Sequence, residues 1–140
     1  MKIKPLRFAA LGDNCIDCYL PLQRAAVGGN AVNVAVQLAR AGEQCSYFGA
    51  IGRDEAGRWT RQTLIENHVS VSCLQELDAP TAYTDIDVDA AGERFIAFED
   101  FGTSALYAPT PADLQQLATL DHIHIGWFKA SAALRQALNG

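Results

Sequence analysis

The sequence lacks the short motifs that mark two large groups of nucleotide-binding proteins. It contains neither G-x-G-x-x-G nor G-x-x-x-x-G-K-[ST], so a Rossmann dinucleotide site and a P-loop are both disfavoured. A cluster of basic residues is missing as well. The 11 Lys and Arg residues are scattered among 16 Asp and Glu residues, and the net charge is -5. A nucleic-acid partner is therefore disfavoured, and a small molecule or a protein is favoured.

Long apolar runs are also missing. No stretch approaches the length of a membrane span, so a membrane partner is not expected. The apolar run near the N-terminus breaks at residues 12–14, too early for the core of a signal peptide. We therefore expect a cytoplasmic protein with reduced cysteines.

Cys15 and Cys18 form a C-x-x-C pair, which raises the question of redox or zinc chemistry. A thioredoxin-like pair should open a helix, but this pair lies in a segment that alternates like a strand. A zinc site would need two more ligands, and the H-x-H spacing of His122 and His124 matches no common zinc finger. Metal and redox chemistry are therefore disfavoured, and no metal ligand is assigned.

The chain has 140 residues, 49% of them hydrophobic, which suits one packed domain over residues 1–140 and is too short for two. Short apolar runs alternate with patterns of helical period, so we predict an α/β fold with a parallel core sheet. The predicted strands cover residues 6–11, 15–20, 44–50 and 122–125, with a further core strand through Val69, Val71 and Cys73; the predicted helices cover residues 30–41, 54–67, 109–120 and 129–138.

The first predicted helix has a clear apolar stripe. Five residues at three- and four-residue intervals should face the sheet: Ala31, Val34, Ala35, Leu38 and Ala41. Asn30 is placed to cap the first turn through its side-chain oxygen, and Gly42 is placed to end the helix.

Gly28, Gly29 and Asn33 remain to be explained. Two adjacent glycines let the backbone take positive φ and let a ligand approach the amide groups. Asn33 lies one turn inside the helix, where asparagine is a poor helix former, so capping does not account for it. Together they suit a hydroxyl-rich or anionic ligand. A tight turn followed by a helix cap is the simpler alternative.

Polar residues follow the first predicted strand. Asp13, Asn14 and Asp17 lie at or beyond its carboxyl end, the edge at which open α/β sheets bind ligands. They are therefore candidate binding residues. An Asx-turn for Asp13 and a solvated strand residue for Asp17 are the alternatives.

Residues 83–88 and 94–99 alternate as two strands around a turn at residues 90–92. No helix separates them, so this β-hairpin should stand off the parallel sheet as a flap over a ligand. Its acidic side chains are expected to be solvated, although one could instead pair with a cationic amine on a ligand: Asp85, Asp87, Asp89, Glu99 and Asp100.

These segments together resemble the ribokinase-like (PfkB) family of carbohydrate kinases. The resemblance rests on residues 11–17, 28–35, 49–57 and 92–94 and on Thr81, and it covers only the amino-terminal half of that family's fold. Within the family, the first two segments look most like fructoselysine 6-kinases. The resemblance implies part of a ribokinase-like, Rossmann-type three-layer sheet, with a β-hairpin lid and lid segments at about residues 15–27 and 81–100.

The resemblance also implies a function, the transfer of the γ-phosphoryl group of ATP with Mg2+ to a hydroxymethyl group of a sugar or a fructoselysine-like sugar-amine. The substrate-binding residues would be Asp13, Asp17, Gly28, Gly29, Asn33 and Arg94. The family's catalytic base is the aspartate of a Gly-Ala-Gly-Asp motif, which this sequence does not contain. We therefore assign no catalytic residue here, and expect most of the ATP site outside the chain.

By itself the chain is therefore expected to be nearly inactive, because a general base alone contributes about 10²–10⁴ in rate. A partial sheet should also expose an open edge, which favours a homodimer or a complementing chain. The alternative is a non-catalytic sugar-binding or assembly module that forms one part of a split protein.

Overall fold

The structure, a computed structural model, describes residues 3–139, so residues 1, 2 and 140 lie outside the described part of the predicted domain. None of the helices in this range is long and apolar enough to cross a membrane. The elements run in the order β1 (Arg7–Leu11), β2 (Cys15–Tyr19), a 3-10 turn (Leu20–Leu22), β3 (Arg24–Gly28), α1 (Asn30–Arg40), β4 (Gln44–Phe48), β5 (Ala50–Gly52), α2 (Glu55–Glu66), β6 (Gln75–Leu77), β7 (Tyr83–Val88), β8 (Arg94–Asp100), α3 (Gly102–Leu106), α4 (Pro111–Leu117), β9 (His122–Ile125) and α5 (Ser131–Asn139).

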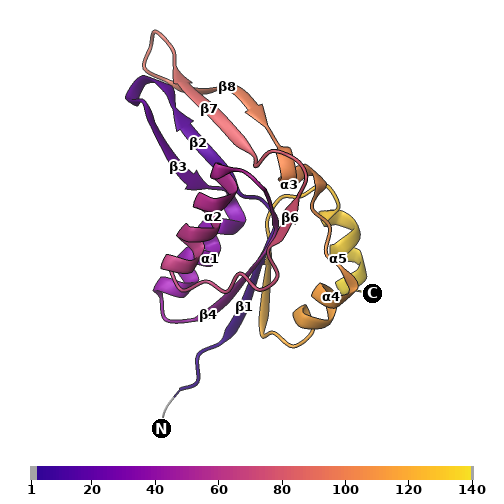
Figure 1. Ribbon diagram of the computed structural model, residues 1–140. Helices are drawn as coiled ribbons and strands as arrows, with labels where there is room; N and C mark the ends of the chain where they lie inside the picture. The colour runs from indigo at the N-terminus through magenta and orange to yellow at the C-terminus, as the bar shows by residue number, and fades with distance from the viewer. Residues whose placement is uncertain (1–2, 140) are drawn as a thin grey trace.

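The main sheet is parallel, with the strand order β4-β1-β9. Helices α1 and α2 cover one face, and α4 and α5 cover the other (Figure 1). Alternate residues of β1 enter different cores, because side chains of a strand point to opposite faces. Ala9 and Leu11 pack in the cluster that includes α4 and α5, while Ala10 packs with α1 and α2. The predicted three-layer α/β fold is confirmed.

A second sheet projects beyond the carboxyl ends of the main sheet (Figure 1). Its strand order is β3-β2-β7-β8; β7 and β8 form the predicted antiparallel hairpin, and β2 pairs with β7 in parallel. The hairpin therefore does not stand alone, because residues 15–27 supply two further strands that pair along it. Both predicted lid segments belong to this one sheet, and its action as a lid remains a proposal.

The predicted core strand through Val69, Val71 and Cys73 is wrong. This segment makes only one isolated bridge to the main sheet, between Ser46 and Ser70. Val69 and Val71 alternate because they pack against the core beneath α1, not because they belong to a ladder of hydrogen bonds. The strand lies further along the chain at β6, which pairs with β5 in a separate two-stranded sheet. Helix α3 was not predicted.

The predicted start and apolar stripe of α1 need correction. Asn30 does not cap the helix; Gly29 occupies the N-cap position, and the Asn30 side chain lies with its Oδ1 2.8 Å from His124 Nε2. Val32, which was not placed on the stripe, is 1% exposed, because the core on this side also includes residues of α2. Ala41 is exposed, since the helix ends at Arg40.

Candidate functional site

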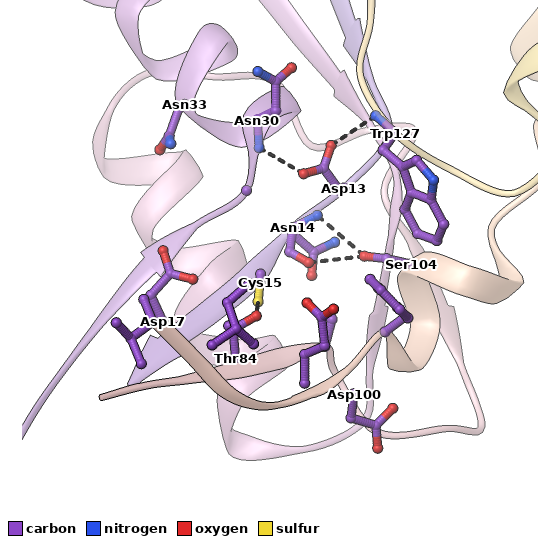
Figure 2. A pocket seen from close by; sticks show the side chains of 16 residues that line it. Asp13, Asn14, Cys15, Asp17, Asn30, Asn33, Thr84, Asp100, Ser104 and Trp127 are labelled. Atoms are coloured by element: carbon purple, nitrogen blue, oxygen red, sulfur yellow. Dashed lines mark hydrogen bonds between the residues drawn. The ribbon is translucent and has the colours of Figure 1, made fainter. Parts of the chain in front are cut away.

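A cavity of about 520 Å3 lies between the second sheet and the carboxyl ends of β1 and β9, and we call it the main cavity. Figure 2 shows that its polar side chains come from several elements and surround one space. The residues that line it are Asp13, Asn14, Cys15, Asp17, Gly29, Asn30, Asn33, Ala82, Thr84, Ile86, Ile96, Glu99, Asp100, Phe101, Ser104 and Trp127.

Four of the six predicted substrate-binding residues line the main cavity, namely Asp13, Asp17, Gly29 and Asn33. Gly28 lies directly behind one of them, since a Cβ atom added there would come within 2.5 Å of Asp17 Oδ2. Arg94 does not line this cavity. It lies further out on β8 with its guanidinium group over the Tyr19 ring, 5.7 Å from the ring centroid. We therefore leave Arg94 out of the sugar site proposed below.

Asp17 reaches the cavity from β2 and is half-buried. Burial raises the pKa of its carboxyl group, and a hydrogen bond from Cys15 offsets this only in part. No salt bridge to Asp17 occurs within residues 3–139. A partly desolvated carboxylate without a paired cation is a strong acceptor for hydroxyl groups of a ligand.

Asp13 has a different set of contacts, although it also follows a strand. Its Oδ2 accepts a hydrogen bond of 2.8 Å from the Asn30 backbone N–H, and its Oδ1 accepts one of 3.0 Å from the Trp127 backbone N–H. These two bonds, drawn in Figure 2, join β1 to the start of α1 and to the segment after β9. Asp13 therefore braces the cavity wall, a role that the predicted binding function did not include.

Asn14 supports the floor of the cavity and is fully buried. Its Nδ2 donates to the Tyr47 hydroxyl at 3.0 Å and to the Ala50 carbonyl at 2.7 Å. The Ser104 hydroxyl donates to the Asn14 carbonyl at 2.9 Å. These bonds fix the loop between β1 and β2, and thus the point from which β2 carries Asp17 into the cavity.

Sequence reasoning missed Thr84, Ser104 and Trp127 as cavity residues. Trp127 follows the carboxyl end of β9, so the rule that singled out Asp13 after β1 could have found it. Thr84 lies in the predicted hairpin, where the alternation of residues did not indicate which face of the hairpin borders the ligand. Ser104 lies on α3, a helix without a signal in the sequence pattern.

The main cavity is lined by acidic but not by basic side chains. Its carboxylates are Asp13, Asp17, Glu99 and Asp100, and its lining contains no Lys, Arg or His. Two members of the predicted acidic stripe are thus part of the lining, Glu99 and Asp100, although Asp100 Oδ1 already accepts the Gly102 backbone N–H at 2.8 Å. Asp89 instead caps the hairpin turn, where its Oδ1 accepts from the backbone N–H groups of Ala91 and Glu93.

The cysteines of the C-x-x-C pair are free thiols. Burial raises the pKa of Cys15 to about 11 and also raises the pKa of Cys18, so neither is an activated thiolate. Within residues 3–139, no three His, Cys, Asp or Glu side chains are arranged to hold a metal ion. We therefore assign no metal ligand and no metal-dependent step to the described residues.

Comparison with known proteins gives consistent results. The sequence profile of the pfkB family carbohydrate kinases matches residues 21–138. The chain is 34% identical over 129 residues to fructoselysine 6-kinase of Escherichia coli K12, a match that covers 91% of this chain and 49% of that protein. It is 35% identical over 94 residues to fructokinase of Klebsiella pneumoniae, covering 66% of this chain and 30% of that protein.

Solved structures share the fold. The ribokinase of Thermotoga maritima matches with a TM-score of 0.73 at 22% identity, covering 84% of this chain and 44% of that one. The apo fructokinase of Vibrio cholerae O395 matches with a TM-score of 0.61 at 33% identity, covering 66% of this chain and 33% of that one. The chain spans about half the length of the fructoselysine 6-kinase that it matches. With a profile match over most of its residues, the chain belongs to the pfkB family of carbohydrate kinases.

Proposed function

We propose that the chain binds the sugar for an ATP-dependent kinase that phosphorylates a hydroxymethyl group of a sugar or of a fructoselysine-like sugar-amine. One observation carries this proposal. Asp17 from β2 and Gly29 and Asn33 from the start of α1 line one cavity at the carboxyl ends of the main sheet. The family membership supports a carbohydrate substrate, and the similarity to fructoselysine 6-kinase supports a sugar-amine.

The groups in the main cavity suit a polyol. The Asp17 carboxylate accepts hydrogen bonds from hydroxyl groups, and the Asn33 amide can both donate and accept. Gly29 has φ +102, and a Cβ there would come within 2.6 Å of the Asp13 carbonyl oxygen. Only glycine therefore allows the backbone to pass this closely behind the binding groups.

The acidic lining suits a sugar that carries an amine. Glu99 and Asp100 lie at the end of β8 and line the same cavity as Asp17. A protonated secondary amine next to the sugar would place its charge among these carboxylates, where no basic side chain of the lining competes for them. A neutral sugar of the same size would lack this interaction.

We propose that the phosphoryl donor and the catalytic base are held by residues that this chain does not contain. The sequence has no Gly-Ala-Gly-Asp segment, and the described residues offer no metal-binding cluster. ATP with Mg2+ supplies the transferred phosphoryl group in such a kinase, and this requirement favours a cytoplasmic location. The contribution of this chain is to bind the sugar, orient its hydroxymethyl group and shield it from water.

Calorimetric titration of the chain with fructose and fructoselysine tests sugar binding. Asp17→Ala should weaken binding by about ten- to a hundredfold, because a hydrogen bond to a charged group contributes about 1.5–3 kcal/mol. Asp87→Ala is the matched control, since Asp87 lies on the same sheet but does not line the cavity. Equal affinities for the unchanged chain and Asp17→Ala would refute the proposed site.

A complementation assay tests the kinase assignment. The chain alone should bind sugar without turning over ATP, and a second polypeptide that carries Gly-Ala-Gly-Asp should restore turnover. Strand β9 forms an edge of the main sheet and is open to pairing with such a polypeptide or with a second copy. Sugar binding that no complementing polypeptide converts into turnover would instead favour a non-catalytic binding module.

A further inference from the structure

The face of the second sheet that borders the main cavity continues well beyond it. Directly paired residues of neighbouring strands point to the same face of a sheet, and a register shift opposite Asp85 and Ile86 pairs Ile96 of β8 with Ile86. From the cavity outward, this face carries three rows: Asp17, Thr84 and Glu99; then Tyr19, Ile86 and Ile96; then Val88 and Arg94. We call it the ladder face.

The ladder face is hollowed where the second and third rows lie. A recess of about 220 Å3 is lined there by Tyr19, Pro21, Leu22, Ile86, Val88 and Arg94. Ile86 also lines the main cavity, so the two spaces adjoin along β7. Ile96 is 58% exposed and Leu22 is 65% exposed, which leaves apolar surface beside the cavity without a cover within residues 3–139.

Charge changes sign along this face. The first row carries Asp17 and Glu99, the second row is apolar apart from the Tyr19 hydroxyl, and the third row ends in Arg94. Arg94 makes no salt bridge within residues 3–139, and its guanidinium group lies over the Tyr19 ring. This order of acidic, apolar and basic groups is complementary to a ligand with a cation, an apolar arm and an anion in the same order.

We propose that the ladder face binds the substituent of a sugar-amine substrate, with its amine beside Glu99, an apolar arm across Ile86 and Ile96, and an anionic end at Arg94. This inference rests on the proposed function. The row of Val88 and Arg94 lies four residues along β7 from the row of Thr84, or about 13 Å. Arg94 extends back from the third row, since its guanidinium group lies over the Tyr19 ring of the second row. A sugar with an arm as long as an amino-acid side chain can therefore reach from Glu99 to this group.

Three probes separate these contributions in calorimetry. They are fructose, 1-deoxyfructose joined through C1 to hexylamine, and 1-deoxyfructose joined through C1 to 6-aminohexanoate. The two amine compounds have arms of similar length and differ in whether the arm ends in a methyl group or a carboxylate. The carboxylate compound should bind the unchanged chain about tenfold more tightly than the hexyl compound, as expected for a charge-assisted hydrogen bond.

Two variants and one control locate the effect. Arg94→Met keeps apolar bulk and removes the charge, so it should make the two amine compounds bind equally. Val88→Ala, at a residue that lines the recess but not the main cavity, should weaken both of them about threefold or more and leave fructose unchanged. Arg40→Met, which removes an exposed arginine at the end of α1 opposite to the end that lines the main cavity, should leave all three affinities unchanged.

The outcomes distinguish this inference from the proposed function. If the unchanged chain binds all three probes with equal affinity, the inference fails while sugar binding stands. If no probe binds, both fail. If Arg94→Met leaves the preference for the carboxylate compound intact but converts a dimer into a monomer in light scattering, the ladder face is an interface between copies, and the inference is wrong.

Discussion

Alanine in place of Gly28 should weaken sugar binding, whereas alanine in place of Gly29 should destabilise the fold. Gly28 has no positive φ, so alanine there adopts the native backbone without strain. Its Cβ would come within 2.5 Å of Asp17 Oδ2, the far end of a side chain that can rotate away. Gly28→Ala should therefore displace the Asp17 carboxylate and leave the fold intact.

Gly29 is surrounded by backbone instead. It has φ +102, and an added Cβ would come within 2.6 Å of the Asp13 carbonyl oxygen and 2.7 Å of the Asn14 Cα. Neither atom can move without shifting the loop between β1 and β2. The backbone of Gly29, with φ 102 and ψ 142, lies in a region that residues with a Cβ rarely adopt, which costs about 1–3 kcal/mol. Crowding costs about 1–3 kcal/mol more, so Gly29→Ala should destabilise the chain by about 2–6 kcal/mol.

Urea denaturation and sugar titration measure the two effects separately. Gly28→Ala should change the free energy of unfolding by less than about 1 kcal/mol. It should weaken sugar binding about ten- to a hundredfold, as Asp17→Ala does. In the double variant with Asp17→Ala and Gly28→Ala, the losses of binding free energy should not add, because both substitutions remove the same interaction. Additive losses, or full affinity in Gly28→Ala, would refute the reasoning about Asp17.

Two further predictions concern stability. Burial acts to raise the pKa of Asp54, but hydrogen bonds from Thr81 and a backbone amide outweigh it and lower the pKa in the folded chain. The ionised carboxylate therefore stabilises the fold fully above about pH 3.9, and this stabilisation is lost as the pH falls through the lower pKa of the folded chain. Asp54→Asn should accordingly make the free energy of unfolding, measured in urea at several pH values, fall less steeply at acid pH. Asn14→Ala removes the donor to Tyr47 and should cost about 1–3 kcal/mol, whereas Asn33→Ala, at an exposed position, should cost less than about 0.5 kcal/mol.

The period of the apolar residues predicted most of the fold, because each helix and core strand buries one or both faces against a neighbouring layer. The same property explains the error at Val69 and Val71, where one side chain is buried and the other partly buried without a ladder of backbone hydrogen bonds. Pairing depends on a partner strand distant in sequence. The parallel pairing of β2 with β7, which joins both lid segments in one sheet, therefore lay beyond local patterns.

Sequence position predicted only part of the candidate site. Strand ends and adjacent glycines indicated Asp17, Gly29 and Asn33, all of which line the main cavity. Ser104 could not be found this way, because it lies on a short helix that reaches the cavity through tertiary contacts. Asn30 was assigned to a cap on local grounds, yet a contact with His124 on the distant β9 determines where its side chain lies.

Asp13 and Asp17 show why a shared position does not imply a shared role. Both follow β1, and the rule for open α/β sheets selects both. In the fold, each oxygen of Asp13 accepts a backbone N–H, so its charge is already stabilised by the start of α1 and the segment after β9. Burial raises the pKa of Asp17, which gains no comparable backbone donors. Of these two carboxylates, Asp17 is thus the one that the fold leaves less satisfied, and it has more to gain from the hydroxyl groups of a sugar.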